Sequence, residues 1–327
     1  MKSSAAAVTL RRFTDADYER LVEIANSVYE DYAWTVAEIR HWDSGWNDPK
    51  YFMRRIVAED AGRIIAYGEA SHSRHTYHPD RYYVEVLVEA PVRGRGVGSE
   101  LYDALIAELE ERNAAALRAQ LKETMTRGIE FAAHRGFVET KRDWESRLDV
   151  ASFDFARFAD APERVARQGI SVATMADEMA RDPAAQRRAF EMHEECGRDV
   201  PTIDPHSPST FESYVRDTFE APGAAPDAYF VAIRDGRYVG ESYMERSIAQ
   251  PDVMYQGLTG VVREERGKGT AMALKLRTVE WARDHGIREI RTWNDTLNRP
   301  MLRINEAMGF AKQPAWIRLT KELRPEQ

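Results

Sequence analysis

Two copies of one short glycine-rich motif stand 173 positions apart in this chain of 327 residues. The first copy reads RGRGVG from Arg93, and the second reads RGKGTA from Arg266. Each copy follows an apolar segment and precedes a helical pattern, so successive backbone N–H groups can point outward at an anion. Glycine lets the backbone approach a phosphate closely. The pair therefore predicts two phosphate-binding loops, one in each half of the chain.

Other landmarks recur in the same order at nearly the same offset. A Val-Ala pair and a following glycine at 57–62 return at 231–236, and the Gly-Phe pair at 136–137 returns at 309–310. This agreement indicates a duplicated domain, far longer than a solenoid unit. A typical domain occupies about 150 residues, so the chain has room for two lobes. We expect domains at 1–150 and 169–327, joined by a helical connector at 151–168.

Hydrophobic periodicity predicts one order of elements in both lobes. The first lobe is expected to hold a strand at 8–10, a helix at 15–29, a hairpin at 51–58 and 63–71, a strand at 82–88 and a helix after 98. The second is expected to hold a hairpin at 229–233 and 238–244, a strand at 254–262, a helix at 270–285 and a strand at 287–293. In both lobes the glycine motif thus joins a strand to a helix.

Composition excludes several classes of protein. The formal charge is −8, which argues against generic nucleic-acid binding. Cys196 is the one cysteine, so an intrachain disulfide and a multi-cysteine zinc site are ruled out. We found neither a signal peptide nor a run of about 18 apolar residues, so we expect a cytoplasmic protein that does not enter a membrane. His72, His75 and His78 lie in a polar loop, and we predict no metal site there.

At its two glycine-rich motifs the chain resembles the GNAT superfamily of acetyl-CoA-dependent N-acetyltransferases, in its tandem two-domain form. The family signature is Arg or Gln, two residues, Gly, one residue, then Gly or Ala. The matching residues are Arg93, Gly96 and Gly98, and Arg266, Gly269 and Ala271. The resemblance implies an α+β fold with two GNAT domains, each a mixed, mostly antiparallel sheet flanked by helices. It also implies acetyl-CoA as cosubstrate and no metal. Tandem relatives include mycothiol synthase, and the likeness to it is loose.

The resemblance further implies which residues hold the cofactor. The backbone at Val88 and Val261 would pair with the pantetheine arm, and the two loops would cradle the pyrophosphate. The loop residues are Arg93, Gly94, Arg95, Gly96, Val97 and Gly98, and Arg266, Gly267, Lys268, Gly269, Thr270 and Ala271. Asn298 stands seven residues before Asn305. In the family, this spacing separates an Asn that binds the cofactor from a Tyr that donates a proton to the departing thiolate. Asn294 lies close by; turn and helix capping also explain such asparagines.

Catalytic groups are less well marked. Asn305 occupies the position of the family's proton-donating Tyr, and an amide cannot supply a proton. In the first lobe the same counts fall on Met125 and Ala132. The usual position of the base is Tyr82 in the first lobe and Tyr255 in the second. The nearby carboxylates are Glu85, Glu241, Glu245 and Asp252, for each of which simple solvation competes with catalysis. Because the second lobe keeps the asparagines, we predict that it is the catalytic one.

The sequence therefore predicts an N-acetyltransferase in which a primary amine of a small molecule or peptide attacks the acetyl thioester directly. Two alternatives stay open, a noncatalytic acyl-CoA sensor and a protein-interaction module with the same fold. A dinucleotide-binding oxidoreductase fits less well, because strands and helices do not alternate strictly. The identity of the acceptor and the choice between monomer and homodimer are not encoded in any motif.

Overall fold

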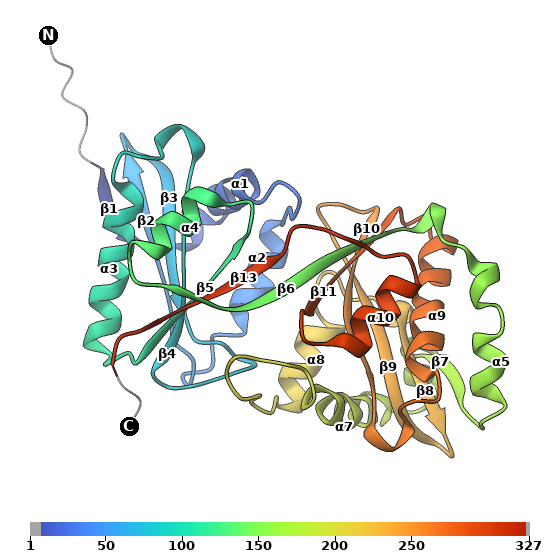
Figure 1. The fold of residues 1–327 in the computed structure, drawn as a ribbon. Coiled ribbons are helices and arrows are strands. Elements are labelled where there is room, and N and C mark those ends of the chain that lie inside the picture. Colours follow the sequence, from blue (N-terminus) through green and yellow to red (C-terminus); the bar gives the residue numbers. More distant parts are fainter. Residues whose placement is uncertain (1–7, 325–327) are drawn as a thin grey trace, which may run out of the picture. The chain divides into compact units, whose positions relative to one another are not determined.

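The computed structural model describes residues 8–324. The chain forms two compact units (Figure 1). The first unit runs to Lys141 and takes back the segment from Ile317 onward, and the second unit spans Arg142–Trp316. Among the described residues, no helix combines the length and the apolar character needed to cross a membrane.

The first unit contains one sheet with strand order β1-β2-β3-β4-β5-β13. The strands are β1 (Thr9–Arg12), β2 (Met53–Asp60), β3 (Arg63–Ser71), β4 (Arg81–Val88), β5 (Ala116–Lys122) and β13 (Trp316–Glu322). The first four are antiparallel, whereas β4 and β5 are parallel. Register pairs between β4 and β5 run only from Arg81 opposite Ala116 to Tyr83 opposite Arg118, at the start of both strands.

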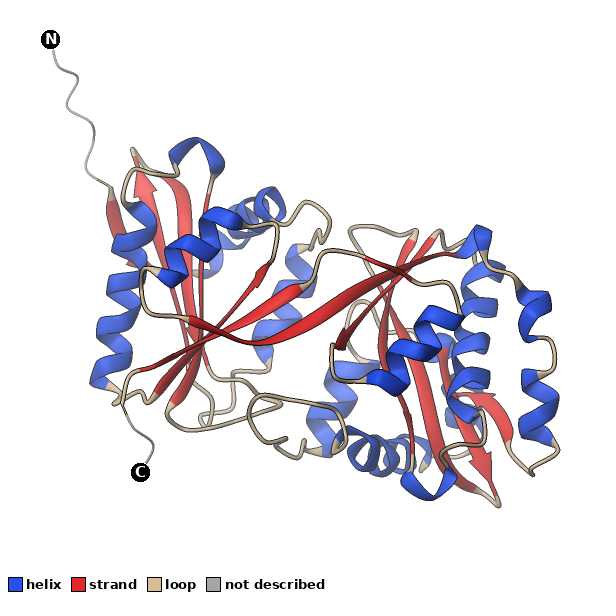
Figure 2. Ribbon diagram, in the orientation of Figure 1, coloured by secondary structure: helices blue, strands red, loops and turns tan. Residues whose placement is uncertain are grey.

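Helices cover the two faces of this sheet (Figure 2). They are α1 (Tyr18–Val28), α2 (Val36–Ser44), α3 (Val97–Glu111) and α4 (Thr126–Ala133). Residues Leu21 and Ile24 of α1 form one apolar cluster with Leu87. Leu101 and Leu105 of α3 belong to a separate cluster with alternate residues of the strands. Because strand side chains alternate between faces, β4 presents Leu87 and Glu85 to the α1 side.

The second unit repeats this plan with strand order β6-β11-β10-β9-β8-β7. The strands are β6 (Val138–Asp149), β7 (Ser171–Thr174), β8 (Tyr229–Arg234), β9 (Arg237–Arg246), β10 (Val253–Val261) and β11 (Glu289–Asp295), with β12 (Ala311–Lys312) beside β6. The helices are α5 (Ala161–Ala166), α6 (Met175–Arg181), α7 (Ala185–Gly197), α8 (Phe211–Phe219), α9 (Thr270–Asp284) and α10 (Arg299–Ala307). Both predicted hairpins form, and each turns through a residue pair with positive φ, Ala61-Gly62 and Asp235-Gly236.

The compact units differ in extent from the division at 150 and 169. β6 follows the first lobe in sequence, yet most of it pairs antiparallel with β11, from Asp149 opposite Glu289 to Asp143 opposite Asp295. The last strand, β13, instead completes the sheet of the first unit. The segment 151–168 belongs to the second unit, where Phe153 and Val165 are buried in its core. As a division of function, 1–150 and 169–327 remains a prediction.

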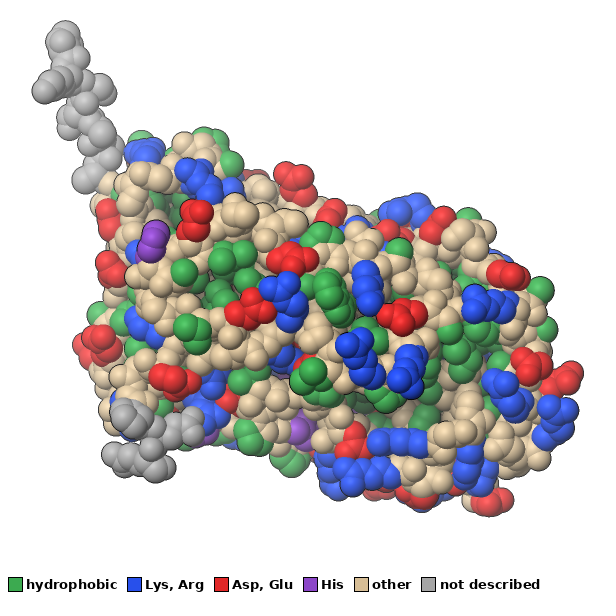
Figure 3. Space-filling model, in the orientation of Figure 1, with side chains coloured by type: hydrophobic (Ala, Val, Ile, Leu, Met, Phe, Trp, Pro, Cys, Tyr) green, Lys and Arg blue, Asp and Glu red, His purple; other side chains and the backbone are tan. Residues whose placement is uncertain are grey.

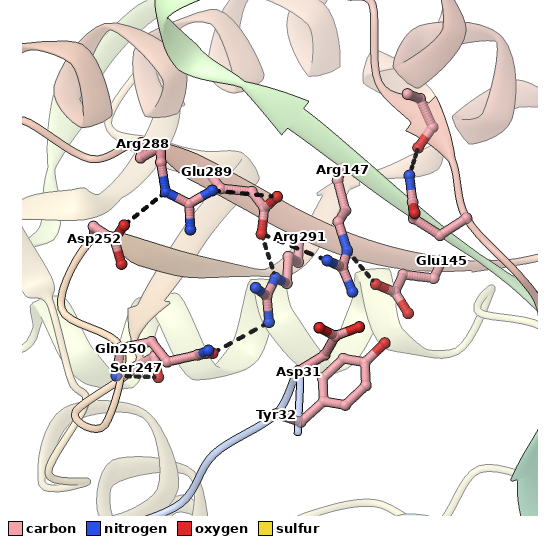
Figure 4. Close-up of polar contacts among 12 residues, drawn as sticks. Asp31, Tyr32, Glu145, Arg147, Ser247, Gln250, Asp252, Arg288, Glu289 and Arg291 are labelled. Carbon is pink, nitrogen blue, oxygen red and sulfur yellow. Dashed lines mark hydrogen bonds and ion pairs between the residues drawn. The ribbon is translucent and has the colours of Figure 1, made fainter. Parts of the chain in front are cut away.

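Charged side chains lie along β6 and β11 and at the residue before β10, and Arg147 Nη1 of β6 lies 4.0 Å from Glu289 Oε1 of β11 (Figure 4). Arg147 Nε donates to Glu145 Oε1 at 2.6 Å, and Arg291 Nε donates to Glu289 Oε1 at 2.6 Å. Arg288 Nε reaches Asp252 at 2.7 Å. Directly opposite positions carry like charges, with Asp149 facing Glu289 and Arg147 facing Arg291, so the opposite charges of Arg147 and Glu289 meet diagonally across the pair. On the face seen in Figure 3, basic and acidic side chains are likewise interspersed on each unit.

Candidate functional site

The two glycine loops have the same backbone conformation. Gly94 and Gly96 have φ of 85° and 91°, and Gly267 and Gly269 have φ of 76° and 87°. Only glycine adopts these left-handed values without strain. Gly96 is the N-cap of α3 and Gly269 is the N-cap of α9. The loops therefore leave the first N–H groups of each helix free to face an anion.

An arginine ties each loop to the preceding strand in the same way. Arg93 Nε donates to the carbonyl of Val88 at 2.9 Å, and Arg266 Nε donates to the carbonyl of Val261 at 2.7 Å. The first motif arginine thus uses its side chain to fix the loop, which leaves the backbone as the anion-binding element. The two loops are structural copies, as expected for a duplicated domain.

A cavity of about 680 Å³ lies at the loop of the first unit. It opens where β4 and β5 diverge beyond their short parallel pairing. Its lining residues are Val28, Tyr29, Val86, Leu87, Val88, Val92, Arg93, Gly94, Gly96, Gly98, Ser99, Leu121, Thr124, Met125, Thr126, Arg127, Gly128 and Phe131. Of the predicted cofactor residues, Val97 is instead buried at the start of α3, and Arg95 pairs with Asp60 at 3.0 Å. The cavity thus joins a glycine loop to an apolar channel along β4.

Glu85 of β4 lies next to this cavity through Tyr29. The Tyr29 hydroxyl donates to Glu85 Oε1 at 2.9 Å, and the Tyr29 side chain lines the cavity. The sequence offered Glu85 as one of several candidate carboxylates, and it could not distinguish a catalytic role for Glu85 from simple solvation. The hydrogen bond from a cavity-lining group is what now distinguishes it.

A row of charged residues runs across the sheet to Glu85. Glu69 of β3 stands opposite Glu85 in the register, and Arg55 of β2 stands opposite Glu69. Arg55 binds both Glu69 and Asp43, the latter at 2.8 Å. Loss of hydration, and then the like charge of Glu69, raise the pKa of Glu85 to about 7. Glu85 keeps contact with solvent, which moderates the loss of hydration.

In the second unit, other parts of the chain cover the glycine loop. Gln168 Nε2 donates to the carbonyl of Lys268 at 3.0 Å, and a Cβ placed on Gly269 would lie 3.2 Å from Arg164 Nε. Arg266 pairs with Asp199 at 2.5 Å. Lys268 pairs with Glu265 at 2.8 Å, and Thr270 is buried at the start of α9. The cations of the second motif are thus already neutralised by neighbouring carboxylates.

The second-unit asparagines occupy capping and buried positions. Asn298 is the N-cap of α10, and its Oδ1 accepts from the N–H of Met301 at 3.3 Å. Asn305 is buried, and its Nδ2 donates to Asn294 Oδ1 at 2.6 Å. The structure therefore brings Asn294 and Asn305 together and gives Asn298 a helix-capping contact.

Glu241 and Tyr255 have different surroundings. Glu241 is fully buried and accepts from His193 Nδ1 at 3.0 Å and from the Tyr229 hydroxyl. Burial alone would lower the pKa of His193, but the charge of Glu241 and the hydrogen bond raise it overall. Glu241 therefore anchors an internal polar network. Tyr255 stands opposite Glu245 in the register, and loss of hydration raises the pKa of Glu245 to about 7.

One histidine of the polar loop at 72–80, His72, is buried in the core. His72 Nδ1 accepts from the N–H of Phe52 at 2.9 Å, and its ring stacks on Tyr82 with centroids 4.5 Å apart. Across residues 8–324, no three His, Cys, Asp or Glu side chains gather to hold a metal ion. His72 is thus a satisfied core residue.

Sequence reasoning missed Tyr29 as a site residue. It is the last residue of the predicted helix at 15–29, and the helical pattern assigns it no role. Its partner Glu85 lies 56 positions later, and no spacing rule connects the two.

Known proteins resemble this chain in both sequence and fold. The sequence model of the Acetyltransferase (GNAT) family matches residues 18–137. The mycothiol acetyltransferase of Thermomonospora curvata is 28% identical over 233 residues, which cover 70% of each chain. The mycothiol acetyltransferase of Thermobifida fusca is 25% identical over 307 residues, 84% of each chain. A tandem GNAT protein from the clavulanic acid biosynthesis pathway has a similar fold, with a TM-score of 0.75, 19% identity, and coverage of 98% of this chain and 100% of that chain.

Proposed function

We propose that the N-terminal unit binds acetyl-CoA and acetylates a primary amine of a small molecule, because the model of the Acetyltransferase (GNAT) family matches residues 18–137 within that unit. The observation that supports this most is the cavity of about 680 Å³ at the first glycine loop. Its loop end offers backbone N–H groups suited to a pyrophosphate, and its apolar length suits a pantetheine arm. When bound, acetyl-CoA supplies an acetyl thioester next to β4.

The sequence favoured the C-terminal lobe as the catalytic one, whereas the geometry of the sites favours the N-terminal unit. The first loop lines a cavity and lies near a carboxylate with a raised pKa. The second loop is covered by Arg164 and Gln168. The C-terminal unit stays as a second candidate because Glu245 and Tyr255 face each other across its strands.

In this proposal Glu85 acts as the general base. A neutral amine that attacks the thioester must lose one proton as the amide forms, and a carboxylate with a pKa near the working pH accepts that proton efficiently. Tyr29 orients the carboxylate through its hydrogen bond. The backbone groups of β4 that follow Tyr83 and do not pair with β5 would hold the thioester and polarise its carbonyl. No covalent bond to the protein is required.

Gly96→Glu should abolish acetyl-CoA binding at the N-terminal unit. The new carboxylate would sit where the pyrophosphate binds, and a side chain at φ of 91° would strain the loop. Isothermal titration with acetyl-CoA measures the effect directly. Gly269→Glu is the matched variant, because Gly269 holds the same position and conformation in the second loop.

The titration separates the candidates. Binding that is lost only in Gly96→Glu supports the N-terminal unit. Binding lost only in Gly269→Glu would move the site to the C-terminal unit. Binding without thiol release across a panel of primary amines would favour an acyl-CoA sensor, and no binding at all would favour an interaction module. Small amines come first in that panel, because the curated relatives are mycothiol acetyltransferases.

A further inference from the structure

We infer that Tyr29 is a catalytic residue that completes a proton relay with Glu85 and protonates the departing thiolate. This inference rests on the function proposed above. The helix α4 carries Ala132 at the position where the family resemblance places the proton donor, and alanine has no proton to give. Tyr29, the C-cap of α1, instead brings a side chain with a hydroxyl to the wall of the cavity.

The backbone holds Tyr29 in place. Its N–H donates to the carbonyl of Ala25 at 2.8 Å, and its carbonyl accepts from the N–H of Tyr32 at 2.8 Å. Its ring packs against the apolar cluster that α1 forms with Leu87 of β4. The hydroxyl therefore lies at a fixed position, 2.9 Å from Glu85 Oε1, on a side chain that lines the cavity.

The relay balances each proton. Glu85 takes the proton that the amine nitrogen loses as its bond to the acetyl carbon forms. As the carbon–sulfur bond breaks, Tyr29 gives its hydroxyl proton to the thiolate. Glu85, now protonated and acting as the donor across the same 2.9 Å contact, then returns the amine proton to the Tyr29 oxygen. The products are an amide and a free thiol, and both side chains regain their starting states.

Electrostatics impose an order on these steps. Burial and the charge of Glu85 both raise the pKa of Tyr29. A phenol beside a carboxylate is a poor acid, so Tyr29 keeps its proton while Glu85 is ionised. Once Glu85 carries the amine proton, the repelling charge is gone. Tyr29 thus becomes an acid only after an amine has been deprotonated, which discourages thioester hydrolysis without an acceptor.

The test compares Tyr29→Phe with the wild-type full-length protein on two thioesters. With acetyl-CoA and the best amine of the panel, we expect kcat to fall about 10²-fold, the lower range for general acid catalysis. With the acetyl thioester of 4-nitrothiophenol, whose thiolate leaves without a proton, we expect kcat/KM to stay close to wild type. A purely structural role would lower both rates by the same factor, and that result would overturn the relay.

A double variant and a control variant test the relay further. Adding Tyr29→Phe to Glu85→Gln should cost no additional activity, because both act in one pathway. Tyr32→Phe is the control, because its hydroxyl accepts from Lys122 and does not line the cavity. Unchanged acetyl-CoA affinity verifies that Tyr29→Phe is folded. A wild-type protein that acetylates no amine would overturn the proposed function and the relay with it, whereas an active protein with equal losses on both thioesters overturns the relay alone.

Discussion

Glu85→Gln should lower kcat/KM for the acceptor amine by about 10²–10⁴-fold, the range for loss of a general base. Glutamine keeps the shape of the side chain and can still accept from Tyr29, but it cannot take a proton. Because Glu85 is not among the residues of the cavity wall that would hold the cofactor, acetyl-CoA affinity should not change. Steady-state thiol release gives the rate, and titration calorimetry gives the affinity.

The pH profile of the wild-type protein tests the same assignment. Glu85 works as a base only when ionised, and its pKa is raised to about 7. The value of kcat/KM should therefore fall as the pH drops below about 7 and reach a plateau above it. Glu69→Gln removes the like charge opposite Glu85, so its profile should begin to fall at a lower pH.

Glu245→Gln is the matched control for this first prediction. Glu245 also has a pKa raised to about 7, but it lies in the C-terminal unit. We expect it to keep near wild-type activity and the same pH profile. Full activity in Glu85→Gln together with a large loss in Glu245→Gln would show that the C-terminal unit performs the reaction.

The glycine loops were predictable because their geometry is local. Gly94 and Gly96, like Gly267 and Gly269, adopt positive φ values that few other residues tolerate, so the motif alone specifies the turn. Comparison with the tandem GNAT fold confirms the predicted fold class of two mixed sheets with helices. The order of strand, loop and helix follows from periodicity over short windows, which needs no tertiary information.

The partners of β6 and β13 were not predictable in the same way. Each strand reads as an ordinary half-buried segment, and nothing within it states which sheet it joins. The choice depends on pairing with residues far away in sequence, such as Glu289 and Arg291 for β6. The compact units therefore run across the boundaries expected at 150 and 169.

The two units also differ in ways that the motifs conceal. RGRGVG and RGKGTA predict equivalent loops, and the loops themselves are equivalent. The loops differ in what lies over them. Side chains of Arg164 and Gln168, from the segment 151–168, and of Asp199, just after α7, contact the second loop. Only the folded chain shows that these side chains reach the second loop. Tyr29 reaches Glu85 through the same kind of tertiary contact.

Lys275→Met should raise the free energy of unfolding of the C-terminal unit by a few kcal/mol at pH 6. Lys275 is 1% exposed in α9, and no carboxylate contributes to its pKa, which loss of hydration lowers from 10.5 to about 7. At about 1.36 kcal/mol per pKa unit, this gap corresponds to roughly 5 kcal/mol of unfavourable burial. Its Nζ lies 4.7 Å from the centroid of Phe310, and methionine would keep that contact through sulfur.

The pH dependence of this effect follows from the sign of the shift. Below about pH 7 the lysine is charged in both states, so the folded state carries the full cost of burying the charge. Between about 7 and 10.5 only the unfolded state binds the proton, and stability rises with pH. The advantage of Lys275→Met should therefore be largest at pH 6 and shrink toward pH 10. Urea unfolding at both values measures it, with Lys312→Met as an exposed control that pairs with Glu306. A destabilised Lys275→Met at pH 6 would contradict this prediction, because it would mean that the interactions of Lys275 in the folded state outweigh the cost of burying its charge.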